Sequence, residues 1–238
     1  MFGFDPLFLL LGIFGMGLVF IPQMFVKSTY EKFSKIAASG GLTGAEIAKM
    51  LLNKAGVHNV DVEPTEGVLS DHYDPSKKIV RLSQDIYYGK SVSAVSIAAH
   101  EVGHAIQDNT NYVPMKLRAG VFPLVQAGQF LGPLLLMAGL GLRFMVNLGG
   151  LTDLIAITGI LLYGSVVVFH IITLPVEFNA SFRAIRVLAD GGYIVDREIS
   201  GAKKVLTAAA FTYIAVALYA LMELLYWVWT FFGNRDRE

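Results

Sequence analysis

The sequence predicts an integral membrane protein in which four helical spans carry a small α+β domain made of two polar inserts. Hydrophobic residues make up 54% of the 238 residues, charged residues only 16%, and the mean hydropathy is +0.55. Soluble domains carry about 25% charged residues, so this chain is too apolar for a soluble monomer. Four separate segments each contain the roughly 20 mostly apolar residues that a bilayer core requires.

These apolar segments set the organisation of the chain. The spans are expected at Leu7–Val26, Val121–Leu142, Leu151–Leu174 and Val205–Phe232. The first span is an anchor and not a cleavable signal, because no Lys or Arg precedes it and its apolar run is too long for a signal core. The expected parts are a first span (1–26), a large insert (27–118), a transmembrane hairpin (119–174), a second insert (175–204) and a fourth span with its tail (205–238).

The first insert is long enough for a small α+β unit. It opens with a basic amphipathic segment, Lys27–Ala38, which we expect to form a helix at the membrane surface. Thr43 and Glu46 have capping-box spacing, which predicts a helix that begins there and ends near Lys54.

Strands and a second helix follow in the same insert. Strands are expected at Val57–Val62, Gly67–His72 and Lys78–Leu82, with Asp74-Pro75-Ser76 as the turn of a hairpin. Ser91–Gln107 has the pattern of a helix, and the second insert is expected to be largely helical.

Basic residues are distributed unevenly between the two sides of the spans. All but three of the 19 Lys and Arg residues lie on the side that holds both inserts, the exceptions being Arg143, Arg235 and Arg237. Loops rich in Lys and Arg stay in the cytoplasm. We therefore expect a multi-pass protein of the inner cell membrane with both inserts in the cytoplasm.

Charge and cysteine content exclude several kinds of site. The 19 basic and 19 acidic side chains cancel, so the net charge gives no indication of a nucleic-acid partner. The chain has no cysteine, which excludes disulfides, iron–sulfur clusters, thiolate zinc sites and a cysteine nucleophile. Any metal must be bound by histidine and carboxylate.

The strongest functional signal in the chain is the sequence His100-Glu101-Val102-Gly103-His104. On a helix, residues i and i+4 share a face, so the two imidazoles can bind one zinc ion. Glu101 follows the first histidine and can accept a proton from a metal-bound water. The alternative is a helix whose two histidines are satisfied by neighbouring side chains.

A catalytic zinc requires a third protein ligand and an open position for water. No third histidine follows this motif at the metzincin spacing, so the candidates are His58, His72, His170 and the acidic residues of 175–204. Glu177 stands out, because it follows the third span at the point where the transmembrane hairpin returns the chain to the same membrane face.

The motif HEVGH, followed after this hairpin by Glu177-Phe178-Asn179-Ala180-Ser181, resembles the YugP-type neutral zinc metallopeptidases of bacterial membranes. It is more distantly similar to the HtpX and CAAX-prenyl-protease group, in which the Glu of an E-x-x-A-D motif is the third ligand. The likeness extends over nearly the whole chain, and its motifs are Leu42–Ala45, Leu69–Pro75, Val80–Ser83, Ala99–Gln107 and Val176–Ala184.

The resemblance implies a zincin-like catalytic domain, built from the two inserts, with one zinc ion per chain. The implied ligands are His100, His104 and Glu177, with Glu101 as the general base.

One position departs from the HtpX-like pattern. Ser181 replaces the Asp that would brace a ligating histidine, so Ser181 or Asn179 could supply a weaker hydrogen bond instead. Arg183, two residues further on, could pair with an acidic side chain near the site, but we interpret it as a solvated or lipid-facing charge.

Weaker signals concern the binding of substrate. Gly67–Tyr73 could be an exposed edge strand that pairs with an extended substrate, or an ordinary hairpin strand. His72 and Tyr73 could stabilise a tetrahedral oxyanion, and His72 could equally cap a turn.

Together these expectations describe a membrane-bound zinc endopeptidase that hydrolyses a protein or peptide substrate. The rival from another class is a catalytically silent membrane scaffold or adaptor with a structural zinc site. A transporter is a weaker alternative, because the spans show no inverted repeat. Glu101 favours the enzyme, since a structural site needs no base. The expected partners are the substrate and the lipid bilayer, and the sequence does not decide between a monomer, a homo-oligomer and a complex with other membrane proteins.

Overall fold

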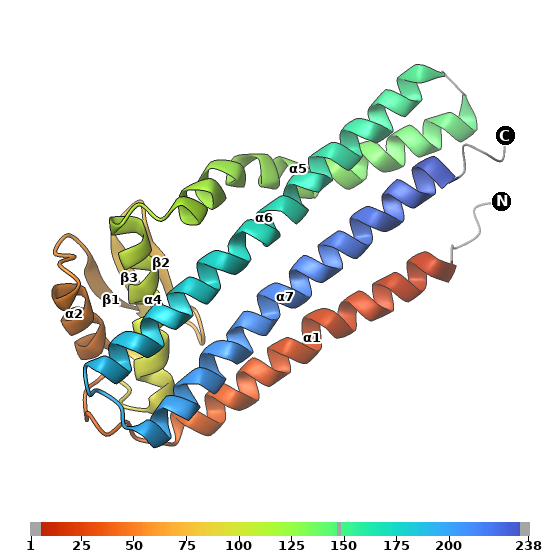
Figure 1. Ribbon diagram of the computed structural model, residues 1–238. Coiled ribbons are helices and arrows are strands. Elements are labelled where there is room, and N and C mark those ends of the chain that lie inside the picture. Colours follow the sequence, from red (N-terminus) through yellow and green to blue (C-terminus); the bar gives the residue numbers. More distant parts are fainter. Residues whose placement is uncertain (1–5, 147–148, 234–238) are drawn as a thin grey trace. The chain divides into compact units, whose positions relative to one another are not determined.

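The computed structural model describes residues 6–146 and 149–233, and within these ranges it contains seven helices and three strands (Figure 1). Four of these helices are long and apolar enough to cross a membrane. They are α1 (Pro6–Ser34), α5 (Val113–Met145), α6 (Gly150–Asp190) and α7 (Asp196–Gly233). The expectation of four apolar helices long enough to span a membrane is therefore confirmed.

Packing divides the chain into two compact units, each built from segments that are distant in sequence. One unit consists of Leu117–Thr173 with the described residues before Ile21 and after Thr212, and the other consists of Ile21–Lys116 and Leu174–Thr212. In the first unit, α5 and α6 approach closely at Gly139, where an added Cβ would lie 2.6 Å from the backbone nitrogen of Ala156. A larger residue at position 139 would force these two helices apart.

The second unit contains a three-stranded sheet with the order β1-β3-β2. β1 (Asp61–Thr65) pairs in parallel with β3 (Ile79–Ser83), and β2 (His72–Asp74) pairs with β3 in antiparallel orientation. The expected hairpin is thus present. Its turn is stabilised by Asp74, whose Oδ1 accepts hydrogen bonds from the first two backbone N–H groups after Pro75.

The central helix of this unit is α4 (Val92–Asn109), which packs against α2 (Gly44–Lys54), against α3 (Gln84–Tyr87) and against the sheet (Figure 1). Ser91 caps α4 as its side chain accepts a hydrogen bond from the backbone of Ala94. Small and β-branched side chains form its buried face and allow neighbouring elements to approach closely: Val92, Ala94, Val95, Ala98, Ala99, Val102 and Ala105.

The predicted α2 begins with a complete capping box. Thr43 accepts a hydrogen bond from the backbone of Glu46, and the Glu46 carboxylate accepts one from the backbone of Thr43. These two bonds satisfy N–H groups that a helix start would otherwise leave unbonded.

One expected helix was wrong. Lys27–Ala38 is not a separate surface helix, because α1 continues without a break to Ser34 and buries Phe33 in the core. No residue in this stretch interrupts a helix, and Lys27 pairs with Glu31 one turn on.

The first two predicted strands were also misplaced. The predicted strand Val57–Val62 starts too early, because its first residue still belongs to the C-terminal cap of α2. Gly56 has φ +69°, and the Val57 N–H donates a hydrogen bond to the carbonyl of Leu52. In Gly67–His72, only His72 is in a strand, because positive φ angles at Gly67 and Leu69 interrupt an extended backbone.

Candidate metal centre

The helix α4 presents His100 and His104 on one face, one turn apart. Their ring centroids lie 4.8 Å from each other, and the rings are nearly perpendicular. His104 is buried, and the side chain of His100 is 12% exposed. The i,i+4 geometry that the sequence predicts is therefore present on a well-formed helix.

Glu177 reaches this face from α6, and its close approach depends on Gly103. A Cβ atom added to Gly103 would lie 2.8 Å from the carbonyl oxygen of Ala180, which is closer than real Cβ atoms come. The absence of a side chain at position 103 therefore lets the backbone of α6 pack directly on α4, and Glu177 is buried between the two helices, 3% exposed.

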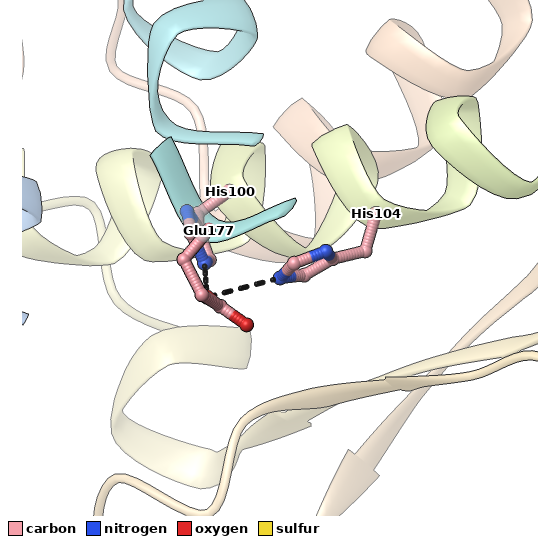
Figure 2. Close-up of side chains that lie close together, drawn as sticks. All are labelled: His100, His104 and Glu177. Carbon is pink, nitrogen blue, oxygen red and sulfur yellow. Dashed lines mark ion pairs between the residues drawn. The ribbon is translucent and has the colours of Figure 1, made fainter. Parts of the chain in front are cut away.

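The three side chains converge on one point (Figure 2). Oε2 of Glu177 lies 3.3 Å from Nε2 of His100 and 3.5 Å from Nε2 of His104, and ligand atoms from all three residues lie within 4.8 Å of one another. Charged N–H···O hydrogen bonds are shorter, at about 2.8 Å. Ligands bound tetrahedrally at about 2.1 Å from zinc are about 3.4 Å apart, so both separations fit a shared metal ion.

The nitrogen atoms on the far side of both rings have polar partners. Nδ1 of His104 lies 3.0 Å from Oε1 of Gln107, and Nδ1 of His100 lies 3.2 Å from Oγ of Ser181. Histidines that bind metals characteristically hydrogen-bond through the other ring nitrogen, which orients the ring. Neutral imidazoles and a carboxylate form a donor set that suits zinc.

The electrostatics of the centre favour a cation. Burial by itself raises the pKa of Glu177, but the adjacent imidazoles of His100 and His104 outweigh burial and hold that pKa well below its usual range. Burial likewise opposes a charge on His104, and the Glu177 and Glu101 carboxylates raise the pKa of that imidazole in spite of it. The carboxylate of Glu177 is thus ionised at neutral pH and supplies negative charge to a bound cation.

Glu101 lies on α4 beside the first histidine and is 7% exposed. A second carboxylate, Asp71, lies near enough for the charge of Glu101 to affect it. Burial is the main cause that raises the pKa of Asp71, and Glu101 raises it further. Asp71 accepts hydrogen bonds from the backbone and side chain of Ser83, which anchor the loop between β1 and β2. Asp71 was not predicted as a site residue: it lies in the Leu69–Pro75 motif, but no ligand spacing includes it.

The other sequence candidates have different partners. Tyr73 donates a 2.6 Å hydrogen bond to Asp108, and Nδ1 of His72 lies 2.8 Å from the carbonyl oxygen of Ser70. In the part of the chain that the structure describes, the grouping of possible metal ligands includes neither His72 nor His58 nor His170.

Asn179 is hydrogen-bonded to Gln107 and Arg183. Its Oδ1 accepts both hydrogen bonds, so Arg183 is not simply a solvated or lipid-facing charge. Gln107 was missed from the sequence, although its position three residues after His104, on the same helix face, is a usable signal.

Comparison with known proteins supports the same chemistry. Residues 8–232 match the family described as "Putative neutral zinc metallopeptidase". The chain is 48% identical over 232 residues, 98% of its length and 100% of the relative's, to the "Putative membrane protease YugP" of Bacillus subtilis (strain 168). No solved structure matches the chain significantly. The chain therefore belongs to this family of neutral zinc metallopeptidases, and the membrane protease is its relative.

Proposed function

We propose that this protein is a membrane-bound zinc endopeptidase of the HExxH type, with one zinc ion held by His100, His104 and Glu177. The observation that carries the proposal is the convergence of two Nε2 atoms and one carboxylate oxygen at separations of 3.3 and 3.5 Å. Three protein ligands leave the fourth position of a tetrahedral ion available for water.

The metal and Glu101 would have different roles in peptide hydrolysis. When bound, zinc lowers the pKa of water to roughly 7 and polarises the scissile carbonyl. Glu101 accepts the proton from the attacking water and later delivers it to the nitrogen of the leaving amine. Its placement next to His100, on the helix that carries both histidines, is suited to this role.

The catalytic domain in this proposal consists of 27–118 and 175–204, and the membrane part consists of 1–26, 119–174 and 205–238. The compact unit formed by Ile21–Lys116 and Leu174–Thr212 supports this division. It contains the sheet, α4 and all three proposed ligands.

We further propose that this domain faces the cytoplasm. The support is the basic residues: all but three of the 19 Lys and Arg lie on its side of the spans. Of the three exceptions, Arg143 lies in the last turn of α5, whereas Arg235 and Arg237 lie outside the described residues.

The proposal can be tested on the purified full-length chain in detergent. Metal analysis should find one zinc per chain, and a casein-type assay should detect proteolysis that a chelator abolishes and added zinc restores. A protein that binds one zinc but cleaves no casein or peptide library would favour the rival, a scaffold with a structural zinc site.

A further inference from the structure

Gln107 is a polar side chain in the interior of the second unit that the proposed mechanism does not use. It is completely buried, 0% exposed. Its Nε2 donates hydrogen bonds to the Val176 carbonyl oxygen at 2.8 Å and to Oδ1 of Asn179 at 3.1 Å, and its Oε1 faces Nδ1 of His104 at 3.0 Å. Burying an amide costs free energy unless its hydrogen bonds are satisfied, and here both ends of the amide are.

Two groups outside this amide set the direction of its hydrogen bonds: the Val176 carbonyl oxygen, which can only accept, and Arg183, one turn beyond Asn179 on α6. Nε of Arg183 lies 2.7 Å from the side chain of Asn179. A guanidinium can only donate hydrogen bonds, so the Asn179 atom that faces it must be the oxygen. The same oxygen faces Gln107, so the Gln107 atom that faces it must be the amide nitrogen.

The orientation of the Gln107 amide determines which ring nitrogen of His104 carries the proton. With Nε2 of Gln107 turned toward Asn179 and Val176, its oxygen is turned toward the imidazole. An amide oxygen can only accept a hydrogen bond, so Nδ1 of His104 must carry the proton. The neutral ring then has its lone pair on Nε2, the atom that lies 3.5 Å from Glu177 Oε2.

We propose that Arg183, Asn179 and Gln107 form a hydrogen-bonded relay that holds His104 in the tautomer whose Nε2 binds the metal. Arg183 and Asn179 are therefore positioning residues, which act on zinc affinity without contacting the ion. This inference rests on the proposed zinc site. It also separates the two histidines, because the Ser181 hydroxyl at His100 can donate or accept and selects no tautomer.

The test uses full-length protein in detergent and measures zinc affinity by competition with a chromophoric chelator, without any substrate. Asn179→Leu keeps the approximate side-chain volume and removes the acceptor, and Asn179→Asp keeps an acceptor oxygen for both donors. Arg183→Met removes the outermost donor. Arg186→Met is its matched control, because Arg186 is exposed on the same helix and pairs with the equally exposed Asp190.

Loss of a hydrogen-bond partner behind a metal-binding histidine weakens metal affinity by about 10- to 100-fold. We expect zinc affinity to fall within this range in Asn179→Leu and by about 10-fold in Arg183→Met. Asn179→Asp and Arg186→Met should bind zinc like the wild type. The absorption spectrum of bound cobalt(II) should change in the two weakened variants only, because it reports the geometry of the ligands.

Wild-type zinc affinity in Arg183→Met, or equal weakening in Asn179→Asp and Asn179→Leu, would overturn the relay. If Asn179→Leu does not fold, as judged by circular dichroism, Asn179→Asp and Arg183→Met still decide the question. The outcome for the peptidase proposal is separate: affinities that follow the expected order in a protein that hydrolyses no peptide would support the relay and contradict the proposed function.

Discussion

Gly103 of α4 lies against Ala180 of α6 so closely that a Cβ atom on the glycine would be 2.8 Å from the alanine carbonyl oxygen and 3.1 Å from its Cα. Both neighbours are backbone atoms, which cannot rotate away. The contact brings Glu177, one turn before Ala180, to the two histidines on either side of the HEVGH core. The glycine within the motif thus determines how closely the third ligand approaches.

Gly103→Ala should therefore damage the site without touching a ligand. The added methyl group must push α6 away, and such overpacking costs about 1–3 kcal/mol of stability. A displacement of about 1 Å at a catalytic centre can reduce the rate about 100-fold. Thermal unfolding and casein hydrolysis should both show the loss. Gly120→Ala is the control, because a Cβ there meets nothing within 4 Å; equal behaviour of the two variants would contradict this account.

Removal of any proposed ligand should remove the metal. His100→Ala, His104→Ala and Glu177→Ala should each weaken zinc binding more than about 100-fold, beyond the loss expected when only a hydrogen-bond partner is removed. Metal analysis after gel filtration measures the zinc retained. Full zinc content at normal affinity in Glu177→Ala would show that another residue is the third ligand.

Zinc should also stabilise the fold, since it binds the folded chain. A ligand present at 100 times its dissociation constant adds about 2.7 kcal/mol to the free energy of unfolding. Thermal unfolding of the wild type should therefore shift to lower temperature with a chelator and return with added zinc. Glu177→Ala should show no zinc-dependent shift; a shift as large as that of the wild type would mean that zinc stabilises the protein from a different site.

The orientation of the protein can be tested by thiol labelling, because the chain has no native cysteine to give a background. A cysteine at the exposed Ser76 should resist a membrane-impermeant reagent in intact cells, and one at Asn234 should react. The reverse pattern would place the catalytic domain outside the cell. Labelling of both positions from outside would mean that the number of spans is wrong.

Much of the site could be predicted because its main signals are local. The helical pattern of Ser91–Gln107 and the spacing of His100 and His104 depend only on α4 itself. Glu177 required one further step, the recognition that a transmembrane hairpin returns the chain to the same face. The capping box at Thr43 was equally local, and it is present as predicted.

The misplaced strand and the hydrogen bonds behind His104 could not be predicted, because they depend on backbone angles and long-range contacts that a sequence pattern does not reveal. Leu69 adopts φ +54°, which is unusual for a leucine, so the apolar pattern from Gly67 onward wrongly predicted a strand. The role of Gln107 depends on Val176 and Asn179, 69 and 72 residues later, and the orientation of the Asn179 amide depends on the direction in which Arg183 donates. Asn179 has no spacing that would identify it, whereas Gln107 lies three residues after His104 on the same helix face.

The central claim, that this is a zinc peptidase with Glu101 as its base, is tested most directly by Glu101→Gln. Glutamine has the size of glutamate and lacks only the proton-accepting carboxylate. The account predicts one zinc per chain, an unchanged unfolding temperature in zinc and no detectable hydrolysis of casein. Undiminished hydrolysis by the zinc-loaded variant would contradict it.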